Sequence, residues 1–320
     1  MNADAAYEVL RHCSPAERCL LRLINRSFNE ACLSWWRQTC VHVDVGRTIA
    51  DTNRRRRSKI LSFLHFLCRH CTWTIRRVSN FSVDDQLLQE MVGASASSSL
   101  TPLFNALESL EVRCLRMENY DALASFLALF QCGVLSELKL TARYPMPVEN
   151  WDGDETPLCA AVVGLVELKK LHLCEMELKG DILTCLSPAL TELVVDQCPD
   201  VEEDSLVTLL AWCLNLERLR LSQVPLSVDT FRHLCSLPRL RKLDLSLNSA
   251  VALTLEWPQC VCDNDAIQEA TLSGRVEGSF GELMDSCQWP LMITEVGDGD
   301  ACSIYCLYLQ NPTNDHENSE

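Results

Sequence analysis

Residues 190–216 read LTELVVDQCPDVEEDSLVTLLAWCLNL, and this stretch decides the fold. It opens with apolar residues at Leu190, Leu193 and Val195, a Leu-x-x-Leu-x-Leu spacing that predicts a short strand. A polar bend follows, and then apolar residues at helical spacing, Leu206 and Leu209. One strand and one helix of this size cannot bury an apolar core alone. The stretch therefore predicts one unit of a repeating array.

The same spacing recurs along the chain. Its positions are Leu107/Leu110/Val112, Leu135/Leu138/Leu140, Leu168/Leu171/Leu173, Leu190/Leu193/Val195, Leu216/Leu219/Leu221 and Leu240/Leu243/Leu245. Successive starts differ by 28, 33, 22, 26 and 24 residues, and looser versions begin at Ile75 and Ile267. Stacked units of this kind align their strands into one curved parallel sheet, with the helices on the outside. We therefore predict an α/β solenoid over residues 71–275.

The unit that begins at Leu190 resembles the cysteine-containing leucine-rich repeat. The matching residues are Leu190, Leu193, Val195, Cys198, Val201, Asp204, Leu206, Leu209, Ala211 and Cys213. In this comparison Asp204 stands just before the helix, and we expect its side chain to cap the free amides of the first turn. The resemblance implies a leucine-rich-repeat solenoid that binds another protein on the concave face of its sheet.

Alternate strand residues face away from the predicted core and form two columns. One column holds Ser109, Glu137, Lys170, Glu192, Arg218 and Lys242, and the next holds Glu111, Lys139, His172, Val194, Arg220 and Asp244. Mixed charge favours selective pairing with one complementary protein over a generic polyanion. For any single charge, solvation is the favoured explanation, so the columns carry weight only as sets. The predicted target-binding residues are Glu111, Lys139, Lys170, His172, Glu192, Arg218, Arg220, Lys242 and Asp244.

Residues 1–45 do not follow the repeat, and their apolar spacing suits short packed helices. They resemble an F-box, with Asp4 at the early acid, Glu17 at the second acid and residues 24–28 (INRSF) at the closing motif, although Asn2 and Arg18 depart from the pattern. The resemblance implies docking of a Skp-type adaptor through Val9, Leu10, Pro15, Leu20, Leu23, Ile24 and Phe28. An F-box followed by these repeats implies a cytoplasmic or nuclear substrate receptor of a cullin-type ubiquitin ligase. The alternative is a repeat scaffold whose amino-terminal helices only cap the solenoid.

Charge divides the chain into two parts. Residues 1–80 carry 14 Lys and Arg against 6 Asp and Glu, or +8, whereas residues 81–320 carry 14 against 38, or −24. An acidic body repels phosphate backbones, so we expect no nucleic-acid partner. The run Arg54–Arg57 lies in the basic linker and helix predicted for residues 46–70. It is either an import or anion-binding patch or a solvated loop.

Several classes of function find no support in the sequence. The start lacks the basic and apolar regions of a signal peptide, and the longest apolar stretch, residues 122–135, is too short to cross a bilayer. We expect most of the 19 cysteines to be reduced core thiols, and His65, Cys68 and Cys71 lack the second ligand pair of a zinc site. The motifs GxSxG, GxxxxGK[ST] and HExxH are absent from the sequence. We therefore expect no enzyme, cofactor, metal or membrane partner.

Three segments depart from the repeat. Residues 144–157, YPMPVENWDGDETP, form an acidic insertion around Trp151, which is either a contact site or a loop packed on its own repeat. Residues 276–310 are expected to cap the array, with a strand over residues 303–309. Residues 311–320 are expected to form a disordered tail.

Overall fold

The structure is a computed structural model. It describes residues 6, 8–10, 12–13, 17–18, 26–38, 41–48, 56–71, 74–96, 100–115, 120–130, 133–142, 154–224, 226–247, 252–253, 256–276, 291–295 and 304–310. The chain divides into two compact units. Unit 1 is Met1–Asn150 with Ala160–Glu167, and unit 2 is Trp151–Cys159 with Leu168–Glu320. Both units alternate helices with strands of a mostly parallel sheet, which confirms the predicted α/β class.

The described residues of unit 1 include four parallel strands in the order β1-β2-β3-β4. Its elements are α3 (Arg26–Gln38), β1 (His42–Asp44), α4 (Val45–Thr48), α5 (Arg56–Cys71), β2 (Arg77–Val83), α6 (Asp85–Ala96), α7 (Thr101–Ala106), β3 (Ser109–Cys114), α8 (Asp121–Leu127), the 3-10 helix η1 (Ala128–Phe130) and β4 (Glu137–Ala142). Helix α9 (Thr156–Val163) falls where the division between the units lies.

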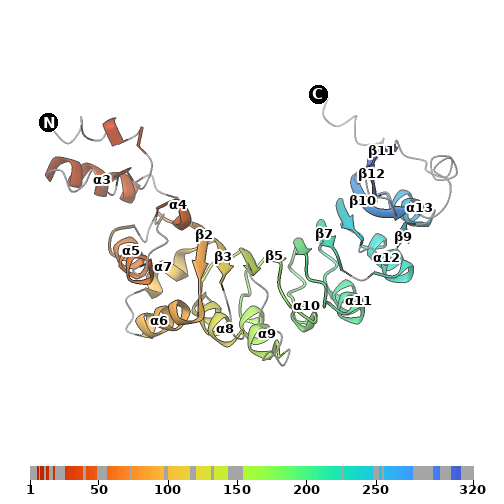
Figure 1. Cartoon of the computed structure of the whole chain (residues 1–320), viewed down its shortest axis with the longest axis horizontal. Helices are drawn as coiled ribbons and strands as arrows, with labels where there is room; N and C mark the ends of the chain where they lie inside the picture. The colour runs from red at the N-terminus through yellow and green to blue at the C-terminus, as the bar shows by residue number, and fades with distance from the viewer. Residues whose placement is uncertain are drawn as a thin grey trace. The chain divides into compact units, whose positions relative to one another are not determined.

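Unit 2 continues the alternation and ends differently. Its elements are β5 (Lys170–Cys174), α10 (Asp181–Thr184), β6 (Glu192–Asp196), α11 (Glu203–Trp212), β7 (Arg218–Ser222), α12 (Val228–Cys235), β8 (Lys242–Ser246), β9 (Ala252–Leu253), α13 (Glu256–Cys262), β10 (Glu269–Val276), β11 (Leu291–Glu295) and β12 (Ile304–Gln310). Strands β5, β6, β7, β8 and β10 are parallel neighbours, whereas β12 and β11 add antiparallel at the end. Helices α10, α11 and α12 lie in a row along one side of the strands (Figure 1). Strand β12 confirms the strand expected over residues 303–309.

The repeated apolar spacing marks the strands correctly. The second leucine of each pattern in unit 2 pairs with its counterpart on the next strand, and all are at most 2% exposed: Leu171, Leu193, Leu219 and Leu243. Leu193 and Leu219 each lie between two other leucines, and Leu243 lies between Leu219 and Ala270. The apolar area removed from water stabilises this stack. The core of unit 2 therefore runs as a ladder of leucines behind the strands.

Each strand of unit 2 from β5 to β7 ends in the same bend. The residues that follow these strands have left-handed backbones, with φ of 55° at Glu175, 55° at Gln197 and 58° at Gln223. Each donates its backbone N–H to a carbonyl at the end of the next strand, at 2.8, 3.1 and 2.8 Å. Left-handed backbone costs an L-residue about 1 kcal/mol or more. The bend is held by a bond that forms only when the neighbouring unit is in place.

The cysteine-containing unit has one helix start that differs from expectation. The prediction that Asp204 caps α11 is wrong, because the helix begins at Glu203 and the residue before it, Glu202, makes no side-chain cap. Asp204 lies inside the first turn instead, where its charge favours the helix dipole. The thiol of Cys198 is fully buried and donates to the carbonyl of Leu173 at 3.7 Å, one repeat back.

Within the described residues, no helix is long and apolar enough to cross a membrane.

Candidate functional site

Two columns of charged residues lie on the sheet of unit 2, as the repeat spacing predicts. We call this surface the strand face. Neighbouring strands pair Lys170 with Glu192, Glu192 with Arg218 and Arg218 with Lys242; in the second column they pair His172 with Val194, Val194 with Arg220 and Arg220 with Asp244. Seven of the predicted target-binding residues therefore stand on one continuous stretch of parallel sheet.

Glu192 is the centre of the first column. Its carboxylate lies 3.5 Å from Lys170 Nζ, 3.1 Å from His172 Nε2 and 3.9 Å from Arg218 Nη1. Only 16% of its side chain is exposed, whereas 58% of the Arg218 side chain is exposed. One carboxylate thus lies within ion-pair distance of three basic side chains.

Arg220 occupies the corresponding place in the second column. Its guanidinium lies 3.6 Å from Asp196 and 3.6 Å from Asp244. Burial raises the pKa of the Asp244 carboxyl above its ordinary value; Arg220 works against this shift and the charge of Asp196 adds to it. The two acids share one arginine, so their charges are only partly compensated.

Two acids of this network were missed from the sequence. Asp196 lies two residues beyond Val194 on the same face of the sheet. Glu269 lies on strand β10, and its carboxylate is 2.7 Å from Lys242 Nζ. The step of two along a strand was the available signal for Asp196, because side chains alternate between faces. The same alternation predicts Glu269, because it directly precedes the core residue Ala270 in the looser repeat that begins at Ile267.

The remaining two predicted target-binding residues belong to unit 1. Lys139 Nζ on β4 and Arg113 Nη2 on β3 lie 3.6 and 3.5 Å from the carboxylate of Glu111. The backbone N–H of Asn80 also points to Glu111, at 3.4 Å. A carboxylate with cations around it therefore recurs in this unit, on the strand pair that the columns predicted.

The predicted adaptor-binding residues are in different environments. Val9 is 45% exposed, but Leu10 and Phe28 are 0% and 7% exposed. Pro15, Leu20, Leu23 and Ile24 lie outside the described residues. Of the three that are described, only Val9 offers apolar surface to a partner in this conformation.

Arg18 contacts the segment that carries Leu10. It replaces an apolar residue of the F-box pattern, and it is itself 7% exposed. Its Nε donates to the carbonyl of Leu10 at 2.7 Å, and its guanidinium stacks 3.6 Å from the ring centre of Trp35 on α3. Next to it, Trp36 packs edge-on against Phe63 of α5. The segment of Leu10 is thereby joined to α3, and α3 to α5.

The basic run is partly engaged in structure. Arg57 forms a bidentate contact with Asp84, at 3.1 Å from Nε and 2.8 Å from Nη2, and Asp84 caps helix α6 by accepting from Leu87 N at 2.9 Å. A hydrogen bond from Arg57 to Asp84 raises the pKa of the guanidinium. Arg54 and Arg55 lie outside the described residues, as do Trp151 and residues 311–320. The two interpretations of the run stay open for its first residues.

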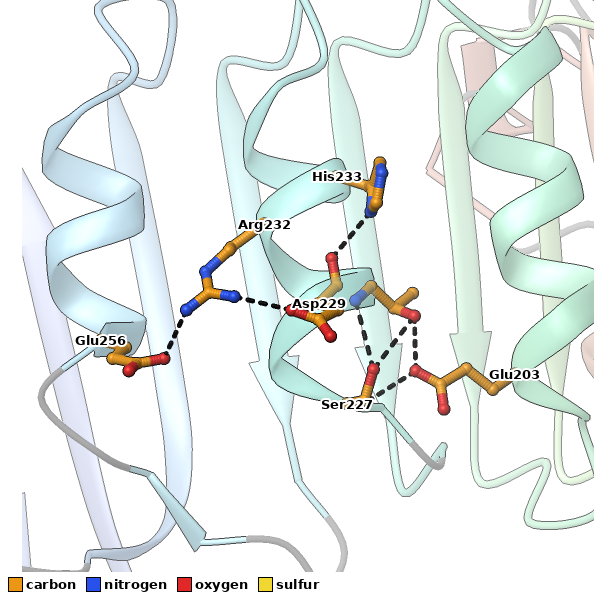
Figure 2. A network of polar contacts seen from close by, with 7 residues as sticks. Glu203, Ser227, Asp229, Arg232, His233 and Glu256 are labelled. Atoms are coloured by element: carbon orange, nitrogen blue, oxygen red, sulfur yellow. Dashed lines mark hydrogen bonds and ion pairs between the residues drawn. The ribbon is translucent and has the colours of Figure 1, made fainter.

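The helix side of unit 2 carries a second polar network, shown in Figure 2. Glu203 of α11 accepts from the backbone N–H of Ser227 at 2.8 Å and from the hydroxyl of Thr230, at the start of α12. Arg232 of α12 bridges to Glu256 of α13 at 2.8 Å. Burial raises the pKa of Glu203, but the hydrogen bonds from Ser227 and Thr230 outweigh it and lower the pKa below its ordinary value. These contacts join successive helices, so the network is structural.

Three buried thiols are poor nucleophiles. Burial raises the pKa of Cys114, Cys159 and Cys198 to about 12, so these side chains are protonated near neutral pH. No group of three or more His, Cys, Asp or Glu side chains within the described residues is arranged to hold a metal ion. His65, Cys68 and Cys71 lie along α5, where Cys71 is buried.

No protein-family model matches the chain, and no curated protein is significantly similar to it. Candidate functions therefore follow from the surface chemistry and from the sequence patterns.

Proposed function

We propose that the chain is a non-catalytic, protein-binding substrate receptor built of cysteine-containing leucine-rich repeats. In this proposal the strand face holds a target protein, and the amino-terminal segment docks a Skp-type adaptor so that a cullin-type ligase ubiquitinates the target. The observation that carries the proposal is the strand face of unit 2, where charged columns lie in register across β5, β6, β7 and β8.

The strand face suits a protein partner because its charges are already held in place. Contacts with carboxylates such as Glu192 and Asp196 orient basic side chains before a partner arrives. A binding surface that is ordered in advance loses less conformational entropy on association. Alternating charges also disfavour partners whose pattern does not match.

A second candidate is a repeat scaffold without a ligase. The burial of Leu10 and Phe28 favours it, since apolar side chains already covered by their own chain contribute no new buried area to an adaptor interface. In this scaffold the amino-terminal helices only cap the first strands. The target-binding role of the strand face is the same in both candidates.

Substitution of Val9 distinguishes the two candidates. The tagged full-length chain is expressed in cells of its natural host, and bound Skp-type adaptor and cullin are quantified by mass spectrometry. The receptor proposal expects both to be recovered with the wild type and lost with Val9→Asp, because a charge replaces exposed apolar surface. Val41→Asp is the matched control, since Val41 is 50% exposed at a position outside the adaptor set. Absence of adaptor from the wild type, or equal loss with both variants, contradicts the receptor proposal.

A further inference from the structure

Basic groups stand further out than acidic groups on the first three strands of the strand face. The exposed side-chain fractions are 44% for Lys170, 58% for Arg218 and 51% for Arg220, against 16% for Glu192 and 27% for Asp196. Further along, Lys242 and Glu269 are almost equally exposed, at 47% and 40%. A molecule that approaches β5, β6 and β7 therefore meets cations first, although the column sums to little net charge.

The two arginines keep their hydrogen-bond donors available. Arg218 and Arg220 lie 3.9 and 3.6 Å from their nearest carboxylates, which is ion-pair distance but too long for a hydrogen bond. Neither guanidinium donates a hydrogen bond to any described residue. Each guanidinium offers five N–H donors in a planar fork that matches a carboxylate. An incoming carboxylate can therefore bind without displacing a protein hydrogen bond.

A pocket adjoins this cationic surface. It has a volume of about 370 Å³ and is lined by Glu217, Pro238, Arg239, Arg241, Asp265, Ala266 and Gln268. Glu217, Arg241 and Gln268 immediately precede strands β7, β8 and β10, so the pocket lies at the amino-terminal ends of these strands. Within the described part of the chain, the exposed side chains of Arg239 and Arg241 have neither an ion pair nor a hydrogen bond. Arg239 and Arg241 thus add open donors at this end of the strands, in a pocket that also holds the acids Glu217 and Asp265.

We propose that this cationic layer, defined as Lys170, Arg218, Arg220, Arg239 and Arg241, binds a short acidic segment of a protein. The inference rests on the proposed function, because it names the chemistry of the target that the strand face holds. A long polyanion is disfavoured, since residues 81–320 carry a net charge of −24 and would repel every part of it that extends beyond the layer. A short carboxylate-bearing segment contacts the layer alone.

The test measures binding of a fluorescein-labelled peptide of alternating Glu and Gly to the full chain, by fluorescence anisotropy. We expect the Glu peptide to bind, the matched Gln and Gly peptide not to bind, and affinity to fall as salt rises. The double variant Arg218→Glu and Arg220→Glu should weaken binding by about tenfold or more, because charge-assisted hydrogen bonds are lost. Arg69→Glu is the matched control: Arg69 is an exposed arginine in the last turn of α5, in unit 1 and not part of the layer, and its substitution should leave binding unchanged.

Folding is controlled with Arg218→Gln and Arg220→Gln, which remove charge without adding repulsion. These variants should keep the wild-type melting temperature and still lose affinity. The inference is overturned if the Glu peptide does not bind, if Arg69→Glu weakens it equally, or if a DNA duplex binds more tightly than the peptide.

A capture experiment separates this inference from the proposed function. Proteins recovered from host cells are compared between the wild type and the double variant, with and without the Glu peptide as competitor. If capture of a protein requires the arginines but the Glu peptide does not displace that protein, the result supports target binding by the strand face and contradicts the inference that the layer binds an acidic segment. Peptide binding without any captured protein that depends on the arginines contradicts the proposed function of the strand face and leaves the acidic-peptide chemistry intact.

Discussion

Replacing Glu155 with Ala should destabilise unit 2 more than any nearby surface change. Glu155 precedes α9, and its carboxylate is fully buried. It accepts from the backbone N–H of Lys179, from Gly180 at 3.1 Å and from Ile182 at 3.0 Å, all at the start of α10. A helix of four residues cannot satisfy its first amides from its own carbonyls. Glu155 therefore supplies the acceptors that this helix lacks.

The size of the effect follows from the amides that would be left bare. Each buried donor without an acceptor costs about 1–3 kcal/mol, and Glu155→Ala leaves at least two backbone N–H groups without an acceptor, those of Gly180 and Ile182. Partial entry of water offsets part of this cost, so we expect a loss of about 3 kcal/mol in the free energy of unfolding. Asp154→Ala is the matched control. Asp154 is exposed and accepts from Thr156 N at 2.9 Å, so its loss should cost about 1 kcal/mol or less.

Urea unfolding followed by circular dichroism measures the stability, and hydrogen exchange of residues 179–184 reports on the local amides. We expect a lower midpoint with an unchanged slope for Glu155→Ala, together with faster exchange of Gly180 and Ile182. Glu155→Gln retains one carbonyl acceptor but sets an amide against a donor, so its stability should lie between Ala and wild type. Equal midpoints for Glu155→Ala and Asp154→Ala, or unchanged exchange at Gly180, would refute the capping role.

Three further changes test the rest of the scaffold. The pKa of the Glu203 carboxyl is lower in the folded than in the unfolded chain, where it is about 4.3. Its stabilisation is therefore present above about pH 4.3 and is lost as pH falls through the lower folded value. Thermal melts should show Glu203→Gln less stable than wild type at pH 7, and the difference in melting temperature should shrink in acid. Leu193→Ala should lower the free energy of unfolding by about 2–5 kcal/mol in urea, since the side chain is fully buried in the leucine ladder. Arg57→Lys should lower the free energy of unfolding by only about 0.5 kcal/mol, because the contact between Arg57 and Asp84 is partly exposed. Hydrogen exchange at the start of α6 should become faster. A loss of stability several times larger would show that the ion pair is stronger than its exposure allows.

The strands of unit 2 were predictable because leucine spacing and strand pairing express the same geometry. A residue three after the first leucine and another two later face the core, which places Leu193 between Leu171 and Leu219. The helix starts were less predictable. The chain can enter α11 at Glu203 without a local cap, so a consensus position for Asp204 did not decide where the helix begins.

The amino-terminal segment shows what pattern matching leaves out. Val9 and Leu10 are adjacent apolar residues, yet one is 45% exposed and the other fully buried. Arg18 adds contacts that the pattern does not contain, because its hydrogen bond to the carbonyl of Leu10 and its stacking on Trp35 join separate segments of the sequence. Such a contact has no signature in spacing.

Acidic residues illustrate the same limit for the functional surface. The sequence counts 38 acids after residue 80, which suggests an acidic exterior throughout. Glu155 and Glu203, however, turn toward backbone amides of the following unit, and Glu192 lies beneath the basic side chains it holds. These acids contact the neighbouring repeat, and basic groups are the outermost charges on β5, β6 and β7. Since local exposure and available donors decide what a surface binds, the partner of the strand face must be inferred from these atoms, and the net charge of the chain alone would select the wrong sign.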